Sequence, residues 1–269
     1  MVLRYFYLEE IMNFSFRRSE IFKNFFLNSS LPSWENCLED RYAMNEQILQ
    51  KYNTNDVLVA EKITFASDAI AGSDITLIDV VARKGITSLK GTVTANYSRL
   101  NDVVAKCGVR LIDTLAQNVE VKKGPLFINY KQKCDVAFNT LYAEEEISMK
   151  GITVAGNVTS RMSIITAENC NLNKIKGCME IKLTKKTSCK AAELAIVPEM
   201  QTGKLFLEDS TIQEDLVINA IESTEESSSS KIKIEITGNG YICGKVIFSK
   251  CTGIVLLSNQ TKITEVVNE

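Results

Sequence analysis

"LIDVVARKG" at residues 77–85 returns as "LNDVVAKCG" at residues 100–108, with six of the nine positions identical. A weaker copy, "LIDTLAQ" at 111–117, keeps Asp113 where Asp79 and Asp102 stand in the first two. The segments between these copies are rich in Val, Ile, Leu and Thr, and they end in runs such as "LKG", "AKCG" and "VKKG". Short alternating segments bounded by such turns indicate strands rather than helices.

A repeat of roughly 20 to 25 residues built from short strands predicts a β-solenoid. With a coil of 23 residues, Val80 and Val103 occupy the same strand position in consecutive coils, and their side chains stack into a ladder. Roughly nine such coils make a rod on the order of 40 Å long. An antiparallel sandwich is the alternative, but it provides no reason for side chains to repeat, and Asn-Gly or Asp-Gly hairpin signals are nearly absent.

The composition changes abruptly between residues 52 and 72. All 13 glycines lie at Gly72 or later, and 11 of the 20 aromatic residues lie in the first 52 positions. We therefore predict a helical N-terminal unit at 1–56, followed by a β-solenoid domain at 57–269. The segment 31–52 has the apolar spacing of an amphipathic helix, with Ser33 as its N-cap.

The helical unit is expected to cap the first coil, because two short aromatic helices cannot bury their apolar faces alone. A surface or partner contact through Phe22, Phe25 and Phe26 is the alternative role for this unit. In the second domain, four consecutive serines beside glutamates predict a solvated loop near 222–230.

The overall composition excludes several classes of function. The chain has 269 residues, a net charge of −2 and no histidine. It therefore lacks Ser-His-Asp and Cys-His catalysis and His-ligated zinc, and its charge provides no basic face for nucleic acid. Its apolar runs are too short to predict a transmembrane segment. No catalytic, cofactor-binding or metal-binding residue is predicted, and we expect a protein that is not an enzyme.

The eight cysteines carry no C-x-x-C spacing. Scattered thiols of this kind predict free cysteines in the reducing cytoplasm. A disulfide-bonded, secreted protein is the alternative.

Three stretches resemble bacterial polar-repeat β-helix proteins, with the bactofilin-like, polymer-forming cytoskeletal family as the nearest named relatives. They are "GTVTANYSRLNDVVAKCG" at 91–108, "GNVTSRMSIITAENCNLNKIKG" at 156–177 and "GYICGKVIFSKCTGIVLLSNQTKITEVVN" at 240–268. The resemblance implies a right-handed parallel β-helix that associates end to end without nucleotide. The coil here is longer and less regular than theirs, and a helical cap over the first coil would hide an edge that polymerisation needs.

The sequence thus predicts a non-enzymatic structural or interaction scaffold that self-associates or binds a partner protein. The alternative is a carbohydrate-binding or polysaccharide-active β-helix protein. A 23-residue coil would align Asp79, Asp102 and Asp113 on one face with Arg83 and Lys106, as a carboxylate site requires. An exposed polar row beside a turn explains the same residues, because charged side chains lie on the outside of each coil.

Overall fold

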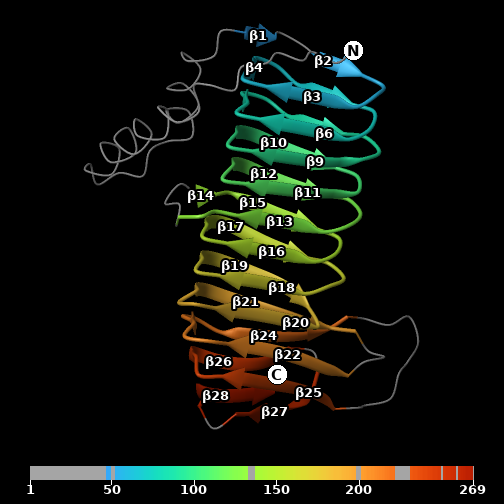
Figure 1. Ribbon diagram of the computed structural model, residues 1–269. Helices are drawn as coiled ribbons and strands as arrows, with labels where there is room; N and C mark the ends of the chain where they lie inside the picture. Colours follow the sequence, from blue (N-terminus) through green and yellow to red (C-terminus); the bar gives the residue numbers. More distant parts are fainter. Residues whose placement is uncertain are drawn as a thin grey trace.

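The computed structural model describes residues 47–49, 52–132, 137–197, 201–221, 231–249, 251–258 and 260–268. Within these residues the paired strands are parallel and no helix occurs. The chain winds into coils that stack along one axis, from the blue N-terminal end to the red C-terminal end (Figure 1). The prediction of an all-β parallel β-solenoid is confirmed, and the sandwich alternative is wrong.

The strands form two parallel sheets. Each coil adds one strand to an 11-stranded sheet, so the described solenoid has about 11 coils. The strands of this sheet are β3 (Leu58–Glu61), β6 (Ile75–Ile78), β9 (Thr92–Asn96), β11 (Gly108–Ile112), β13 (Leu126–Asn129), β16 (Ile147–Lys150), β18 (Ile165–Glu168), β20 (Glu180–Thr184), β22 (Thr202–Leu207), β25 (Ile232–Gly238) and β27 (Gly253–Leu257).

A 17-stranded sheet contains the remaining strands. In several coils this sheet contains two short strands, such as β7 and β8. In other coils one long strand, such as β10, pairs with both short strands of its neighbour. Its strands are β1 (Gln47–Leu49), β2 (Tyr52–Thr54), β4 (Ile63–Phe65), β5 (Ala69–Ala71), β7 (Val81–Ala82), β8 (Ile86–Ser88), β10 (Arg99–Ala105), β12 (Leu115–Val121), β14 (Ala137–Phe138), β15 (Thr140–Ala143), β17 (Thr153–Ser160), β19 (Asn171–Cys178), β21 (Ser188–Ile196), β23 (Thr211–Ile212), β24 (Leu216–Ala220), β26 (Tyr241–Ser249) and β28 (Lys262–Asn268).

The coil is shorter than the sequence repeat suggested. Leu58 pairs with Ile75, and Ile75 pairs with Val93, so these coils take 17 and 18 residues. Other coils are longer, such as the one in which Leu126 pairs with Ile147. The predicted 23-residue coil and the estimate of nine coils are therefore wrong.

The two copies of the opening repeat fall in different sheets. Leu77 lies in β6 of the 11-stranded sheet, whereas Leu100 lies in β10 of the 17-stranded sheet. Val103 pairs with Ile86 and not with Val80, so the predicted ladder of Val80 and Val103 is also wrong. Leu77, Val80 and Ala82 are buried, as are Leu100, Val103 and Ala105, but the two copies lie at different positions around the coil.

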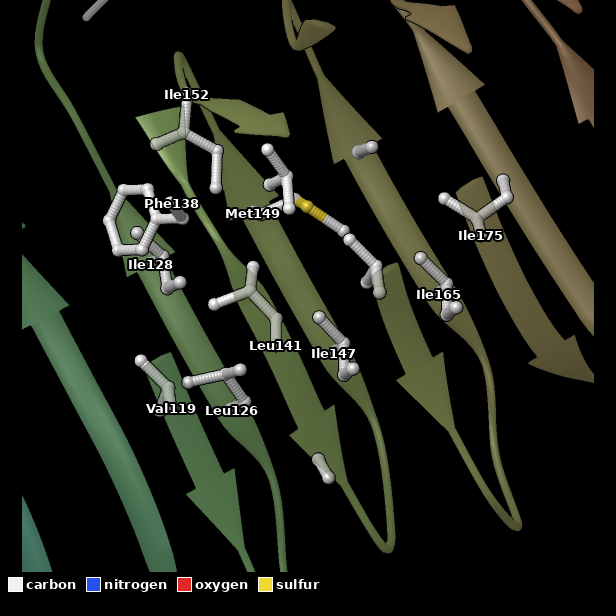
Figure 2. Close-up of a cluster of buried hydrophobic side chains, with 14 of the residues drawn as sticks. Val119, Leu126, Ile128, Phe138, Leu141, Ile147, Met149, Ile152, Ile165 and Ile175 are labelled. Atoms are coloured by element: carbon white, nitrogen blue, oxygen red, sulfur yellow. The ribbon is translucent and has the colours of Figure 1, made fainter. Parts of the chain in front are cut away.

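The interior of the rod is built from alternate residues of both sheets. Inward side chains such as Leu126 and Ile128 of β13, Leu141 of β15 and Ile147 of β16 are buried and point into one continuous core (Figure 2). Fully burying one aliphatic side chain stabilises a fold by about 1.5–3 kcal/mol relative to leaving it exposed. Since each coil covers its neighbours, stability is shared among adjacent coils.

The turn that leads out of the 11-stranded sheet recurs at the same place in successive coils. Lys62, Asp79, Tyr97 and Asp113 follow β3, β6, β9 and β11, with φ angles of 52°, 55°, 54° and 45°. This left-handed conformation is uncommon for side chains other than Asp and Asn. The backbone N–H of Asp79 donates to the carbonyl of Asn96 in the next coil at 3.0 Å, so the turns are bonded to one another.

Buried hydroxyl groups line the inside of this corner. Val80 N donates to Ser98 Oγ at 3.0 Å, and Ser98 N donates to Thr114 Oγ1 at 3.1 Å. Cys170 N donates in the same way to Thr187 Oγ1 at 3.2 Å. Because a buried amide without a partner costs about 1–3 kcal/mol, these hydroxyls stabilise the corner.

Strand pairing begins before the predicted domain boundary at 56/57. β1 pairs with β4, and β2 pairs with β5. The helix predicted over 31–52 is therefore wrong for residues 47–49 and 52. The rest of the predicted helical unit, including Phe22, Phe25 and Phe26, and the predicted loop at 222–230 lie outside the described residues.

Candidate interaction surfaces

The three aspartates predicted to share one face lie on two different parts of the coil. Asp79 and Asp113 occupy the same corner two coils apart, with Tyr97 between them. Asp102 lies within β10, where its Oδ1 accepts a hydrogen bond from Asn118 Nδ2 at 2.7 Å. The predicted alignment is wrong because it depended on a 23-residue coil.

The two basic residues of that predicted site are also apart. Arg83 directly follows β7 and Lys106 directly follows β10, so they lie at two further turns of the coil. Across the described ranges, no group of three or more Asp, Glu, Cys or His side chains is arranged to hold a metal ion.

The corner that holds Asp79 and Asp113 also carries a lysine. Lys131 Nζ lies 3.2 Å from Tyr97 Oη and 3.6 Å from Asp113 Oδ2, and its backbone N–H donates to Asp113 Oδ1 at 2.9 Å. The hydrogen bond and the electrostatic interaction with Tyr97 raise the pKa of Lys131, and the charge of Asp113 adds to this effect. These contacts tie three coils together at the surface.

Several outward aromatic rings are covered by cations from neighbouring coils. The Arg110 guanidinium lies 5.2 Å from the ring centre of Phe127, and Lys182 Nζ lies 5.3 Å from that of Phe206. The same contact at 5.5 Å joins Lys131 to Tyr97 and Lys262 to Tyr241. Such contacts contribute about 0.5–1 kcal/mol at exposed sites. These contacts link coils at the surface, although Tyr97 and Tyr241 are still 37% and 48% exposed.

Charges stacked along the rod alternate in sign in several columns. Glu168 lies between Lys150 and Lys185, with both Nζ atoms 2.8 Å from its Oε1, and these hydrogen bonds hold the pKa of Glu168 below its ordinary value. Burial acts to raise the pKa of Glu193, but hydrogen bonds led by the one from Lys176 at 2.6 Å outweigh it and lower that pKa.

One edge of the rod departs from this alternation. Lys90, Lys106, Lys122 and Lys123 lie within two residues after the strands of the 17-stranded sheet in three successive coils, and Lys123 N donates to the carbonyl of Lys106 at 2.7 Å. We call these four residues the lysine edge. They follow strands β8, β10 and β12 in the turns quoted above as "LKG", "AKCG" and "VKKG".

The next coil places the opposite charge at the same edge. Glu144, Glu145 and Glu146 follow β15, and Glu144 N donates to the carbonyl of Val121 at 3.2 Å. We call these three residues the glutamate edge. Neither edge was predicted from the sequence, although lysines at 90, 106 and 122 recur every 16 residues.

Two shallow depressions lie on the described part of the surface. The larger, of about 390 Å³, lies over the 11-stranded sheet and includes Thr92, Cys107, Arg110 and Phe127. A second, of about 350 Å³, lies over the 17-stranded sheet beside Asn118. Small-molecule sites are typically enclosed and mostly apolar, and neither depression has that character.

The last described coil leaves part of the solenoid interior uncovered. Leu257 of β27 and Val266 of β28 pair with Ile236 and Val246, which are fully buried in the coil before. Leu257 and Val266 occupy the same inward positions but are 43% and 39% exposed. Within the described residues β27 and β28 each pair with one strand only, so the other edge of each strand is open.

The outer face of this coil is apolar as well. Ile254 and Leu256 point outward from β27 and are 47% and 43% exposed. Their partners in β25 are Lys233 and Glu235, which form an ion pair at 2.8 Å. A strand that is apolar on both faces is typical of one that is covered on both faces.

Comparison with known proteins does not add a relative. No protein-family model matches the chain, and neither curated proteins nor solved structures provide a match. Of the residues that the structure describes, none belongs to a helix with the length and apolarity needed to span a membrane.

Proposed function

We propose that this protein is a non-enzymatic structural scaffold that self-associates through the last described coil of its β-solenoid. The observation that carries the proposal is the open end formed by β27 and β28, where Leu257 and Val266 are exposed at inward positions. A second molecule stacked on this end would cover these side chains and pair the open strand edges.

Two physical terms favour such a contact. Covering apolar surface is favourable by about 25 cal/mol per Å², and an open strand edge offers unpaired N–H and C=O groups to another chain. The resemblance to bactofilin-like proteins, which associate end to end, agrees with this role. It remains a resemblance of turn and strand pattern.

The polysaccharide alternative has less support. Asp79 and Asp102 lie on different parts of the coil, and the outward rings of Phe127 and Phe206 are covered by cations. We therefore expect Asp79→Asn together with Asp102→Asn to leave the length of the particles seen by electron microscopy unchanged.

Electron microscopy of negatively stained particles tests the proposal. A single rod of about 11 coils is about 50 Å long at the spacing of parallel strands. We expect the natural chain to form joined rods of at least twice this length as its concentration increases. Leu257→Lys places a charge in the end contact and should abolish the rods of at least twice this length.

Ile78→Lys is the matched control. Ile78 is 37% exposed, close to the value for Leu257, but it lies at the end of β6 far from the open coil. This variant should form joined rods like the natural chain, and circular dichroism should show that both variants are folded. Single rods from the natural chain at every concentration, or joined rods from Leu257→Lys, would refute the proposal.

A further inference from the structure

The lysine edge stacks like charges where other columns of the rod alternate them. Lys90, Lys122 and Lys123 are exposed and Lys106 is half-buried. Successive coils lie about 4.8 Å apart, a distance at which like charges repel one another even in water. No ion pair involves any of the four within the part of the chain that the structure describes.

The fold does not require lysine at these positions. The glycines of the same turns have a packing reason: a Cβ on Gly91 would lie 2.3 Å from Asp74 Oδ1, and one on Gly124 would lie 2.2 Å from the carbonyl oxygen of Cys107. Lys90, Lys122 and Lys123 have no such packing reason, because their side chains are exposed. Their repeated positive charge therefore indicates an external group of negative charge.

The glutamate edge supplies a group with that charge. Glu144 is engaged by Arg161 Nη1 at 3.1 Å and by Tyr142 Oη at 2.9 Å. Glu145 and Glu146 are exposed, and no ion pair to either occurs among the described residues. They follow directly on the coil of Lys122 and Lys123, so one edge carries adjacent patches of opposite sign.

We infer that two copies of this protein pair side by side and antiparallel along this edge. A two-fold axis that crosses the edge between Lys123 and Glu144 places Lys122 and Lys123 opposite Glu145 and Glu146 of the second copy. The same axis places the glutamates of the first copy opposite the lysines of the second. Such a contact is closed, because the same patch is used on both molecules.

Exposed apolar side chains flank the two patches. Leu89 directly precedes Lys90 and is 54% exposed, and Met162 directly follows Arg161 and is 65% exposed. Both belong to the same edge, one on the lysine side and one on the glutamate side. They provide apolar contact area beside the ion pairs of the antiparallel arrangement.

This contact is separate from the end contact proposed above, and salt distinguishes them. Exposed ion pairs weaken as ionic strength increases, whereas burial of apolar surface does not. The side-by-side pair should therefore form in about 20 mM salt and separate in about 0.5 M salt, where charges are screened beyond a few ångström.

Sedimentation of charge-reversal variants tests the inference. All samples carry Leu257→Lys, so the end contact is blocked and only the side contact is measured. In low salt this background should sediment as a pair of 30.0 kDa chains. Lys122→Glu with Lys123→Glu should give single chains, and Glu145→Lys with Glu146→Lys should do the same.

A mixture of the two charge-reversed proteins provides the decisive result. One variant is acidic and the other is basic at all four of positions 122, 123, 145 and 146, so an equimolar mixture should restore the pair. Lys84→Glu with Lys190→Glu changes the net charge equally at exposed positions elsewhere and should keep the pair.

Two outcomes would overturn the inference. Single chains from the background protein in low salt would show that the edge does not pair at all. If the lysine variant separates the pair but the mixture does not restore it, the glutamate edge is not its partner, and the lysines serve a different anionic group. Neither outcome affects the end contact, which the electron microscopy of the natural chain measures independently.

Discussion

Cys189 shows how the solenoid interior changes the chemistry of one side chain. Its thiol is fully buried and donates to the carbonyl of Ala191 at 3.1 Å. Burial raises the pKa of Cys189 to about 12, so the reactive thiolate is suppressed at neutral pH. Cys107, in contrast, is exposed at the lysine edge.

We therefore expect iodoacetamide at about pH 8 to modify Cys107 and leave Cys189 unmodified in the folded protein. Peptide mass spectrometry, with a sample in urea as the control for full reactivity, measures both sites. The raised pKa also has a consequence for stability. The unfolded thiol loses its proton above about pH 8.5, whereas the folded thiol keeps it up to about pH 12. The contribution of Cys189 to the free energy of unfolding is therefore fully present below about pH 8.5 and declines as the pH rises to about 12. Equal modification of the two cysteines in the folded state would contradict this account.

At the scale of the strand and its turn, glycine is required only where the backbone or a neighbouring coil leaves no room for a side chain. Gly124 has a φ of +106°, and a Cβ at this position would lie 2.2 Å from the carbonyl oxygen of Cys107. Gly85 is a matched contrast, since its nearest neighbour is the flexible carboxylate of Asp68 at 3.2 Å.

Gly124→Ala should lower the free energy of unfolding by about 1–3 kcal/mol, because it adds strain and a steric clash between coils. Gly85→Ala should change that free energy by less than about 1 kcal/mol, since Gly85 N still donates to Asp68 Oδ1. Urea denaturation of both variants measures the difference. A Gly124→Ala protein as stable as Gly85→Ala would show that the turn adjusts without cost.

The corner turns also show which part of the coil repeat can be recognised in the sequence. "LID" occurs at 77–79 and again at 111–113, and "NY" occurs at 96–97 and 129–130. These spacings of 34 and 33 residues each span two coils, since Asp79, Tyr97, Asp113 and Tyr130 occupy the same corner in successive coils. The longer match between residues 77–85 and 100–108 suggested a 23-residue coil instead of this two-coil spacing.

Over the whole molecule, stability should decrease toward the open end. Inner coils are paired on both sides, whereas β28 pairs only with β26 among the described strands. In stacked-repeat proteins each coil is stabilised by its nearest neighbours, so an end coil opens at a lower free energy than an inner one.

We expect the amides of β28 to exchange with deuterium at least tenfold faster than those of β12 in dilute protein carrying Leu257→Lys. In concentrated natural protein the exchange of β28 should slow, because the proposed end contact covers it. Hydrogen exchange followed by mass spectrometry measures both segments in one experiment. Equal protection of β28 and β12 in the single rod would contradict a nearest-neighbour origin of its stability.

The alternation of apolar residues and the recurring turns are local properties, and they were sufficient to predict parallel coils around one apolar interior. Leu77 and Leu100, which begin the two copies of the opening repeat, both point inward with 0% exposure. The length of a coil and the charges that share an edge depend instead on which strands pair across coils, and a local pattern does not specify that register. For this reason the lysine edge, the glutamate edge and the open apolar end are apparent only in the stacked coils.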